Sequence, residues 1–535
     1  MSDKQPIYIL PEGTERMIGK DAQRNNILAA KLVADAVKTT LGPKGMDKML
    51  VDATGEITIT NDGVTILEKM EIEHPAAKMM VEISKTQEKE VGDGTTTAVM
   101  LAGKLLENAE KLLDMKIHPT VITKGYMIAS EKAREFLEKV GIEITSERTD
   151  ILKQIVMTAM TGKSAESVKE HLADIVVNAI SQIQEQGNVD IKNVKIVKNK
   201  SGSIENTKLI QGLIIDKERV SIEMPVHVRE AIIALLSEPL ELKNIQESKI
   251  SITSPEQMQE FLDREETMLK EMVALMKRSG ATVIFCQKGI DDVVQYYLAK
   301  ENIYACRRVA KSDMETIAKA TGAKITSSIK ELSEKDLGYA DIVEEIKHGE
   351  EAMTYIQGCR NPKALTILIH GGSEHVMDEV ERAVKDGLGD VAAVIKDKKI
   401  VAGAGAIEIE LSRLLQNFSQ SLSGREQLAV QEFARALEFI PLTLAENAGL
   451  DPIDIITELK ALHDNGQAYA GINIFNNKVE NVLEKGIIEP ITIKKQALSS
   501  ATEVAVMILR IDDVLASKQP QSVSGTGKGI EGVDE

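Results

Sequence analysis

The two ends of this 535-residue chain carry helical patterning, whereas the stretch between them alternates strands with helices. In residues 24–40, apolar side chains recur on one side of a helix, which Gly42-Pro43 then ends. The same helical pattern returns in residues 408–417, 426–447 and 497–509. Because the ends resemble each other and differ from the middle, we expect one helical domain built from both ends, with an α/β part inserted between them.

The middle of the chain, from about residue 216 to 366, reads as an α/β layer domain. Residues 281–286 and 303–306 are apolar strand-like runs, and residues 290–299 and 314–320 between and after them have helical patterns. Repeated strand–helix alternation of this kind is typical of helices packed on a sheet. In the first part of the chain, residues 49–52 and 56–60 predict a short hairpin.

One helix of this middle part is unusually long. Ser254-Pro255-x-Gln257 resembles a capping box with proline in the first turn, and the apolar pattern continues to Ser279-Gly280. Some 24 residues at 1.5 Å each would span about 36 Å. Two interpretations stay open: an ordinary core helix, or a projecting arm whose methionines suit adaptable contacts with a partner.

Composition narrows the class of protein. Aromatic residues make up 3% of the chain and tryptophan is absent, so the core must rely on aliphatic side chains and the 21 methionines, which favours close helix packing. A net charge of −18 disfavours nucleic acid and anionic membranes as general partners. Cys286, Cys306 and Cys359 are widely spaced and predict buried reduced thiols rather than disulfides or a zinc site. With no apolar run of about 18 residues and no signal-peptide pattern, we expect a cytoplasmic protein without a membrane span. Residues 517–535 read as a disordered tail.

The turn Gly92-Asp93-Gly94-Thr95-Thr96-Thr97 is the strongest candidate for chemistry. Its glycines permit positive φ and close backbone approach, and the threonines begin a helix whose first amides lack intrahelical partners. Such an N-terminus can bind an anion, and Mg²⁺ would bridge Asp93 to a phosphate. A turn capped by Asp93 or Thr95 fits the same residues equally well.

Other candidates are weaker when taken singly. Gly42-Pro43 can simply end a helix, Asp62 can be a turn residue, and Asp386 can be a solvated surface charge on a charged helix. The small residues 401–406 suit either tight packing or a nucleotide cradle. The chain has neither a Walker motif nor a Rossmann glycine fingerprint.

Taken together and in order, these blocks resemble a known family. They are Leu41-Gly42-Pro43-Lys44-Gly45, Thr60-Asn61-Asp62-Gly63-Val64-Thr65-Ile66, His74-Pro75-Ala76-Ala77, Gly92-Asp93-Gly94-Thr95-Thr96-Thr97 and Glu446-Asn447-Ala448-Gly449-Leu450-Asp451-Pro452. The sequence is similar to group II chaperonins of the TCP-1/chaperonin-60 family, and closely to their archaeal thermosome branch. The resemblance covers essentially the whole chain apart from the tail.

The resemblance implies a multidomain α and α/β fold. A mainly helical equatorial ATP-binding domain would comprise residues 1–147 and 402–516, and a small α/β intermediate hinge domain residues 148–215 and 367–401. Residues 216–366 would form an α/β apical substrate-binding domain, with a helical protrusion at about 242–276. The resemblance further implies a homo- or hetero-oligomeric double ring with eight subunits per ring, which encloses unfolded protein clients. The protrusions would serve as a built-in lid, so no separate lid co-chaperonin is expected.

The resemblance also implies roles for individual residues in binding ATP and Mg²⁺. Asp93 matches the Mg²⁺ ligand, and Asp62 and Asp386 match the carboxylates that position and activate the attacking water. The nucleotide-binding matches are Leu41, Gly42, Pro43, Gly94, Thr95, Thr96, Thr97, the sensing lysine Lys163, Gly405, and the ribose carboxylate Glu489.

The chain departs from the family pattern at three places. The family's Gly-Gly-Gly is Gly403-Ala404-Gly405 here, its Asp-Ala-Leu is Asp386-Gly387-Leu388, and the tail lacks a Gly-Met-rich repeat. Gly387 would loosen its helix, and Ala404 forbids the most glycine-like backbone angles. Besides an ATP-driven folding chamber, two alternatives remain: a client-binding structural ring without a productive cycle, and a metabolic ATPase on an α/β scaffold.

Overall fold

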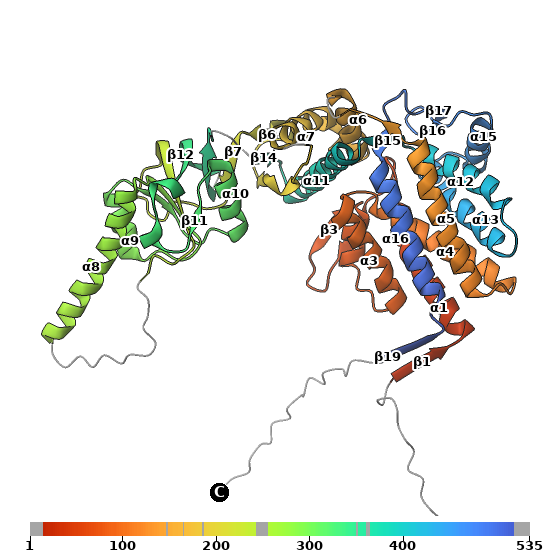
Figure 1. The fold of residues 1–535 in the computed structure, drawn as a ribbon, viewed down its shortest axis with the longest axis horizontal. Helices are drawn as coiled ribbons and strands as arrows, with labels where there is room; N and C mark the ends of the chain where they lie inside the picture. The colour runs from red at the N-terminus through yellow and green to blue at the C-terminus, as the bar shows by residue number, and fades with distance from the viewer. Residues whose placement is uncertain are drawn as a thin grey trace, which may run out of the picture.

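The computed structural model describes residues 14–145, 148–163, 165–184, 187–241, 255–348, 351–359 and 364–517. These residues form three lobes in a row, with the two chain ends together at one lobe (Figure 1). The fold is therefore multidomain, with a mainly helical part and α/β parts, as the sequence predicts. Ser254 of the expected capping box, the start of the expected protrusion and nearly all of the expected tail lie outside the described residues.

The helical lobe is assembled from both ends of the chain. Helix α16 packs against α3, α4 and α5, so a C-terminal helix lies within the N-terminal ones. A Cβ on Gly103 would come within 2.4 Å of the Ala34 Cβ, and one on Gly125 within 2.5 Å of the Ala429 Cβ. Small residues thus let the helices approach closely, as the scarcity of aromatics predicts. The helices are α1 (Lys20–Lys38), α2 (Gly63–Lys69), α3 (Pro75–Val91), α4 (Thr95–Asp114), α5 (Pro119–Val140), α12 (Ala406–Ser419), α13 (Glu426–Leu437), α14 (Phe439–Asn447), α15 (Pro452–Asp464) and α16 (Ile491–Leu509).

The helical lobe also contains short paired strands. Strand β1 (Thr14–Ile18) pairs antiparallel with β19 (Asp513–Ser517), which joins the chain ends, and the expected hairpin is β2 (Lys48–Val51) with β3 (Ile57–Thr60). A second hairpin is β16 (Ala470–Asn473) with β17 (Lys478–Asn481). Ser517, which the sequence placed at the start of a disordered tail, is the last residue of β19.

The sequence predicted one helix over residues 426–447, and the structure corrects this. The helix breaks at Glu438 into α13 and α14. Pro441 lies three residues after the break, and a proline ring clashes with the carbonyl four residues before it, here that of Leu437. The break therefore falls where Pro441 demands it.

The middle lobe has its own apolar core. Helices α6 (Thr149–Met160), α7 (Lys169–Ile183) and α11 (Glu374–Asp397) pack with a sheet in the order β5-β14-β6. The strands of this sheet are Val194–Asn199, Leu365–His370 and Lys208–Ile210. At the junction with the helical lobe, β15 (Lys399–Ala402) lies between β18 (Ile488–Pro490) and β4 (Ile142–Glu143).

The α/β lobe is a mixed sheet with helices on both faces. Its strand order is β10-β9-β8-β12-β13-β7, with β11 pairing β8. Alternate residues of β8 serve opposite faces: Ile233 and Leu235 share a core with α10, whereas Ala234 and Leu236 pack with α8 and α9. The elements are β7 (Gly212–Ile215), β8 (His227–Leu236), α8 (Pro255–Ser279), β9 (Val283–Cys286), α9 (Asp292–Lys300), β10 (Tyr304–Cys306), α10 (Lys311–Thr321), β11 (Ile325–Thr326), β12 (Gly338–His348) and β13 (Glu351–Gln357).

The expectation of buried, reduced cysteines is confirmed. Cys286, Cys306 and Cys359 are free and buried. Among the helices of the described residues, none combines the length and apolar character that a bilayer crossing requires.

Candidate nucleotide site

The turn between α3 and α4 has the conformation that an anion site needs. Gly92 (φ 83°) ends α3 and Gly94 (φ 77°) precedes α4, so both adopt the left-handed region that glycine tolerates. Asp93 Oδ1 accepts a hydrogen bond from Gly94 N at 2.7 Å. The N-cap of α4 is Gly94, which offers no side-chain cap, so neither Asp93 nor Thr95 caps this helix. This geometry favours the anion-site interpretation of the turn over the capped-turn alternative.

Beside this turn lies a cavity of about 580 Å³ at the junction of the helical and middle lobes. Every residue predicted for the site lines it, although the residues come from segments far apart in sequence. They are Leu41, Gly42, Pro43, Asp62, Asp93, Gly94, Thr95, Thr96, Thr97, Lys163, Asp386, Gly405 and Glu489.

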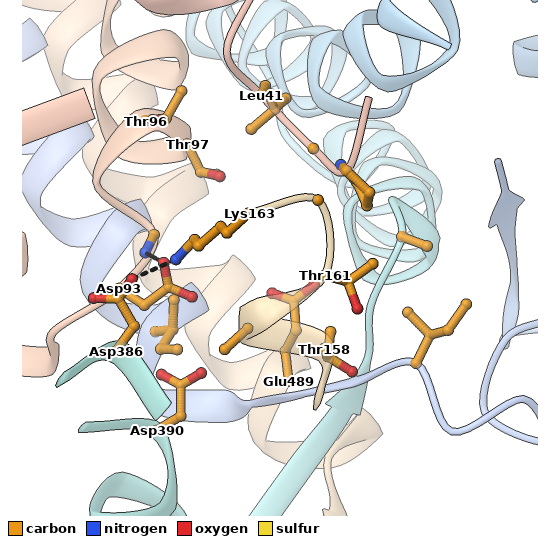
Figure 2. A pocket seen from close by; sticks show the side chains of 18 of the residues that line it. Leu41, Asp93, Thr96, Thr97, Thr158, Thr161, Lys163, Asp386, Asp390 and Glu489 are labelled. Carbon is orange, nitrogen blue, oxygen red and sulfur yellow. Dashed lines mark hydrogen bonds and ion pairs between the residues drawn. The ribbon is translucent and has the colours of Figure 1, made fainter. Parts of the chain in front are cut away.

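Asp386 and Lys163 form an ion pair at one side of this cavity, next to Asp93 (Figure 2). Burial raises the pKa of Asp386 to about 7; Lys163 acts against this, while Asp93 and Asp62 add to it. Burial acts to lower the pKa of Lys163, but Asp386, Asp93 and Asp62 outweigh it and raise that pKa. Lys163 therefore stays protonated, and the Asp386 carboxyl group gains or loses its proton near neutral pH.

Two loops that carry site residues meet behind this pair. Lys163 follows Gly162, whose φ is 81°, and a Cβ on Gly162 would lie 2.3 Å from the Pro43 Cα. This close approach joins the end of α6 to the loop after α1. Gly387 allows a comparable approach on the other side, since a Cβ there would lie 2.9 Å from the Val156 Cγ1 on α6. The departure at Gly387 therefore accommodates tight packing of α6 on α11.

Asp62 has a structural task as well as a place in the cavity. It caps α2, and its Oδ2 accepts hydrogen bonds from Thr65 N (3.1 Å) and Thr65 Oγ1 (2.6 Å). The turn-residue interpretation of Asp62 is therefore correct, and it does not exclude the functional one.

Glu489 and Gly405 line another part of the cavity. Gly405 (φ 81°) precedes α12, and Ala404 beside it also has a positive φ of 53°. Ala404 thus takes up the left-handed backbone that the family's glycine would adopt more easily. Burial raises the pKa of Glu489, whereas its ion-pair partner Lys494 (2.6 Å) lowers it.

Sequence reasoning missed several ionisable residues that line the cavity, and Asp390 and Lys494 are two of them. Asp390 is 3% exposed, and its Oδ1 has no hydrogen-bond partner within the described part of the chain. Burial and the nearby charges of Asp93 and Asp386 raise its pKa well above the usual range. Its position, one helical turn after Asp386, could have revealed it. Lys494 carries no such signal, because it lies in an apolar helix pattern.

The carboxylates suit a magnesium ion that also binds phosphate. Within the described ranges no three acidic, histidine or cysteine side chains form a metal cage. Mg²⁺ instead commonly takes one or two carboxylates together with phosphate oxygens. Asp62, Asp93 and Asp386 all line the cavity, so carboxylates and bound phosphate could share one cation there. Asp93 in the turn therefore fits such an ion.

A family model described as the TCP-1/cpn60 chaperonin family matches residues 33–519. The chain belongs to this chaperonin family. It is 55% identical to the thermosome subunit beta of Archaeoglobus fulgidus, over 98% of this chain and 97% of the relative. It is also 55% identical to a thermosome subunit of Methanopyrus kandleri (97% and 96%) and 53% identical to one of Pyrococcus abyssi (99% and 98%). The resemblance inferred from the sequence motifs is confirmed.

Proposed function

We propose that this chaperonin subunit is an ATPase that couples ATP hydrolysis to the folding of enclosed protein clients. The observation that carries the proposal is the cavity itself. Residues from both chain ends meet Asp386 there, and Asp386 comes from α11 of the middle lobe. On this proposal the helical, middle and α/β lobes are the equatorial, intermediate and apical domains of a chaperonin subunit.

The phosphates of ATP would bind at the α4 N-terminus. The amides and hydroxyls of Thr95, Thr96 and Thr97 are donors there, and Asp93 would hold Mg²⁺. When bound, Mg²⁺ would neutralise phosphate charge. The loop Leu41–Pro43 would flank the nucleotide, and Gly405 and Glu489 would contact its ribose.

Hydrolysis needs an oriented water and a proton acceptor. Asp62 and Asp386 would orient the water, which attacks the terminal phosphorus as the bond to the bridging oxygen breaks. The Asp386 carboxylate takes the proton of the water, and ADP and phosphate leave. Lys163 pairs with Asp386 here, so an incoming phosphate would offer Lys163 a second anion and release the base. Because Asp386 lies on α11, movement of the middle lobe would gate the reaction.

The thermosome subunits named alpha and beta among the relatives support assembly into rings of one or several subunit types. We propose a cytoplasmic double ring with eight subunits per ring, closed by the protrusion that includes α8, without a separate lid protein.

The test pairs ATP hydrolysis with refolding of a denatured client, for the wild type and Asp386→Ala. Loss of a general base costs about 100-fold or more in turnover. Asp378→Ala is the matched control, since Asp378 lies on the same helix but pairs with Lys198 (2.6 Å) away from the cavity. A wild type without ATPase activity refutes the proposal, and full turnover in Asp386→Ala removes Asp386 from the mechanism. Client binding without ATP-dependent refolding would favour a structural ring.

A further inference from the structure

A buried ion-pair triad lies directly behind Glu489. Lys494 Nζ of α16 lies 2.6 Å from Glu489 Oε2 of β18 and 2.9 Å from Glu408 Oε1 of α12. The side chains of Lys494, Glu489 and Glu408 are 10%, 24% and 5% exposed. One lysine therefore holds two carboxylates from two other elements, at a place where water screens charges poorly.

The lysine of this triad stays charged. Burial acts to lower the pKa of Lys494, but Glu408 and Glu489 outweigh it and raise that pKa. Breaking such a buried pair leaves an uncompensated charge, so the partners are held firmly in place. The triad therefore sets two carboxyl groups against a single ammonium group.

Glu489 lines the cavity, and Lys494 engages one of its two carboxylate oxygens. Lys494 engages Oε2, whereas Oε1 lies beside Gly403, where a Cβ would come within 2.6 Å of it. A carboxylate oxygen in an environment of net negative charge favours a neutral hydrogen-bond donor and disfavours a phosphate.

The triad also borders the turn Gly92–Thr97, the proposed phosphate site, which is called the phosphate turn below. A small cavity of about 20 Å³ is lined by Thr97, Glu408 and Lys494 among others, and it is large enough for about one water molecule. Glu408 Oε2, buried and without a hydrogen-bond partner among the described residues, belongs to a side chain lining this space. The triad thus spans from the phosphate turn to Glu489.

We propose that Lys494, anchored by Glu408, is a positioning residue that orients Glu489 to accept a hydrogen bond from a ribose hydroxyl. The cavity then selects ribonucleoside triphosphates over deoxyribonucleoside triphosphates. This inference rests on the proposed function, in which Glu489 contacts the sugar. It adds the residue that sets the orientation of Glu489 and the chemical class of nucleotide that the site accepts. The proposal also gives the orientation of the bound nucleotide. Its phosphates would lie at Thr95–Thr97, and its sugar hydroxyls would lie at the triad.

The experiment measures kcat and KM of the full-length assembled protein for ATP, 2′-deoxy-ATP and 3′-deoxy-ATP. Hydrogen bonds to charged groups predict that the wild type prefers ATP over at least one analogue by about 10-fold or more in kcat/KM. Lys494→Met keeps the aliphatic stem but removes the charge, and should reduce this preference to about threefold or less, mainly through KM. Lys494→Arg should restore most of the preference.

Lys495→Met is the matched control, because Lys495 is the next residue of α16 but pairs with Glu138 outside the cavity. It should keep the wild-type preference. Glu408→Gln provides a second, milder variant that weakens the hold on Lys494 and should reduce the preference partly. An unchanged preference in Lys494→Met or Glu408→Gln overturns the inference. Equal kcat/KM of the wild type for all three nucleotides also overturns it while leaving the ATPase proposal intact, whereas no hydrolysis at all refutes that proposal itself.

Discussion

At the residue scale, Asp386 is an acid whose ionisation is set by its surroundings. Burial raises its pKa to about 7 against the opposing effect of Lys163. As the proposed general base, Asp386 must be ionised, so kcat/KM for ATP should fall as the pH drops through about 7. Lys163→Met removes a cation that lowers this pKa, and the midpoint should therefore move to higher pH. Hydrolysis measured between about pH 5.5 and 9 tests this, and a midpoint that stays or moves lower contradicts it.

Ala404 is a second residue of interest, because its backbone conformation is energetically unfavourable. Its φ of 53° places an L-residue in the left-handed region, which is unfavourable by about 1–2 kcal/mol before the unfolded-state entropy of glycine is counted. Ala404→Gly should therefore raise the free energy of unfolding by up to about 1 kcal/mol, seen as a higher denaturation midpoint. Ala406→Gly is the control, because Ala406 begins α12 and glycine should destabilise that helix. A lower midpoint for Ala404→Gly would show that no strain is relieved.

The same scale shows why the site was only partly predictable. The turn around Asp93 could be found because its glycines and threonines are contiguous. Asp390 was also within reach, since it lies four residues after Asp386 on one helix face. Lys494 was not, because its role depends on Glu408 and Glu489, which other elements bring to it.

At the scale of elements, some local features could be predicted from the sequence, whereas the long-range pairing of the chain ends could not. Hairpin β2–β3 could be predicted because its turn residues and alternation lie within 13 residues of sequence. The break at Glu438 is just as local, but the apolar periodicity around it outweighed Pro441 in the prediction. Strand β1 pairs with β19, so that Thr14 lies opposite Ser517. Nothing in the sequence of either strand indicates which strand it pairs with.

The two halves of helix α8 differ in burial. Its buried residues, Leu269, Val273, Met276 and Ser279, all lie in its second half, and the rest projects beyond the α/β lobe (Figure 1). This division favours the projecting-arm interpretation. Replacing residues 246–266 by a short Gly-Ser linker keeps the four buried residues of α8, so the lobe should fold and most of the proposed ATP hydrolysis should remain.

The replacement should nevertheless leave clients unenclosed, measured as their persistent digestion by an added protease in the presence of ATP. Glu260→Gln is the control. It removes an exposed charge from the first half of α8 and leaves the length of the helix unchanged. Protection of clients by the shortened protein would show that α8 is not part of the lid.

At the scale of the whole molecule, α11 connects the lobes. Asp378 near one end pairs with Lys198 of the middle-lobe sheet, and Asp386 further along faces the cavity. Gly389 brings the helix against the phosphate turn, since a Cβ there would lie 3.1 Å from the Val91 carbonyl oxygen. Any rotation of the middle lobe therefore moves Asp386 relative to Asp93, so a change of domain orientation would alter the proposed site of hydrolysis.

The hairpin β2–β3 makes a prediction about assembly. Its register pairs Met49 with Ile59 and Val51 with Ile57, and these apolar side chains share one face that is 40–65% exposed. An apolar strand face turned to solvent is typical of an interaction surface, and a neighbouring subunit would cover it.

Val51→Lys puts a charge on that face, at its turn end, and should prevent rings from forming, because a buried unpaired lysine is strongly unfavourable. Light scattering coupled to size-exclusion chromatography should then give the mass of a single chain or a small oligomer instead of a ring. Thr54→Lys is the matched control: it adds the same charge at the exposed turn of the same hairpin and should leave the ring intact. A ring of unchanged mass from Val51→Lys would place the subunit interface elsewhere on the helical lobe.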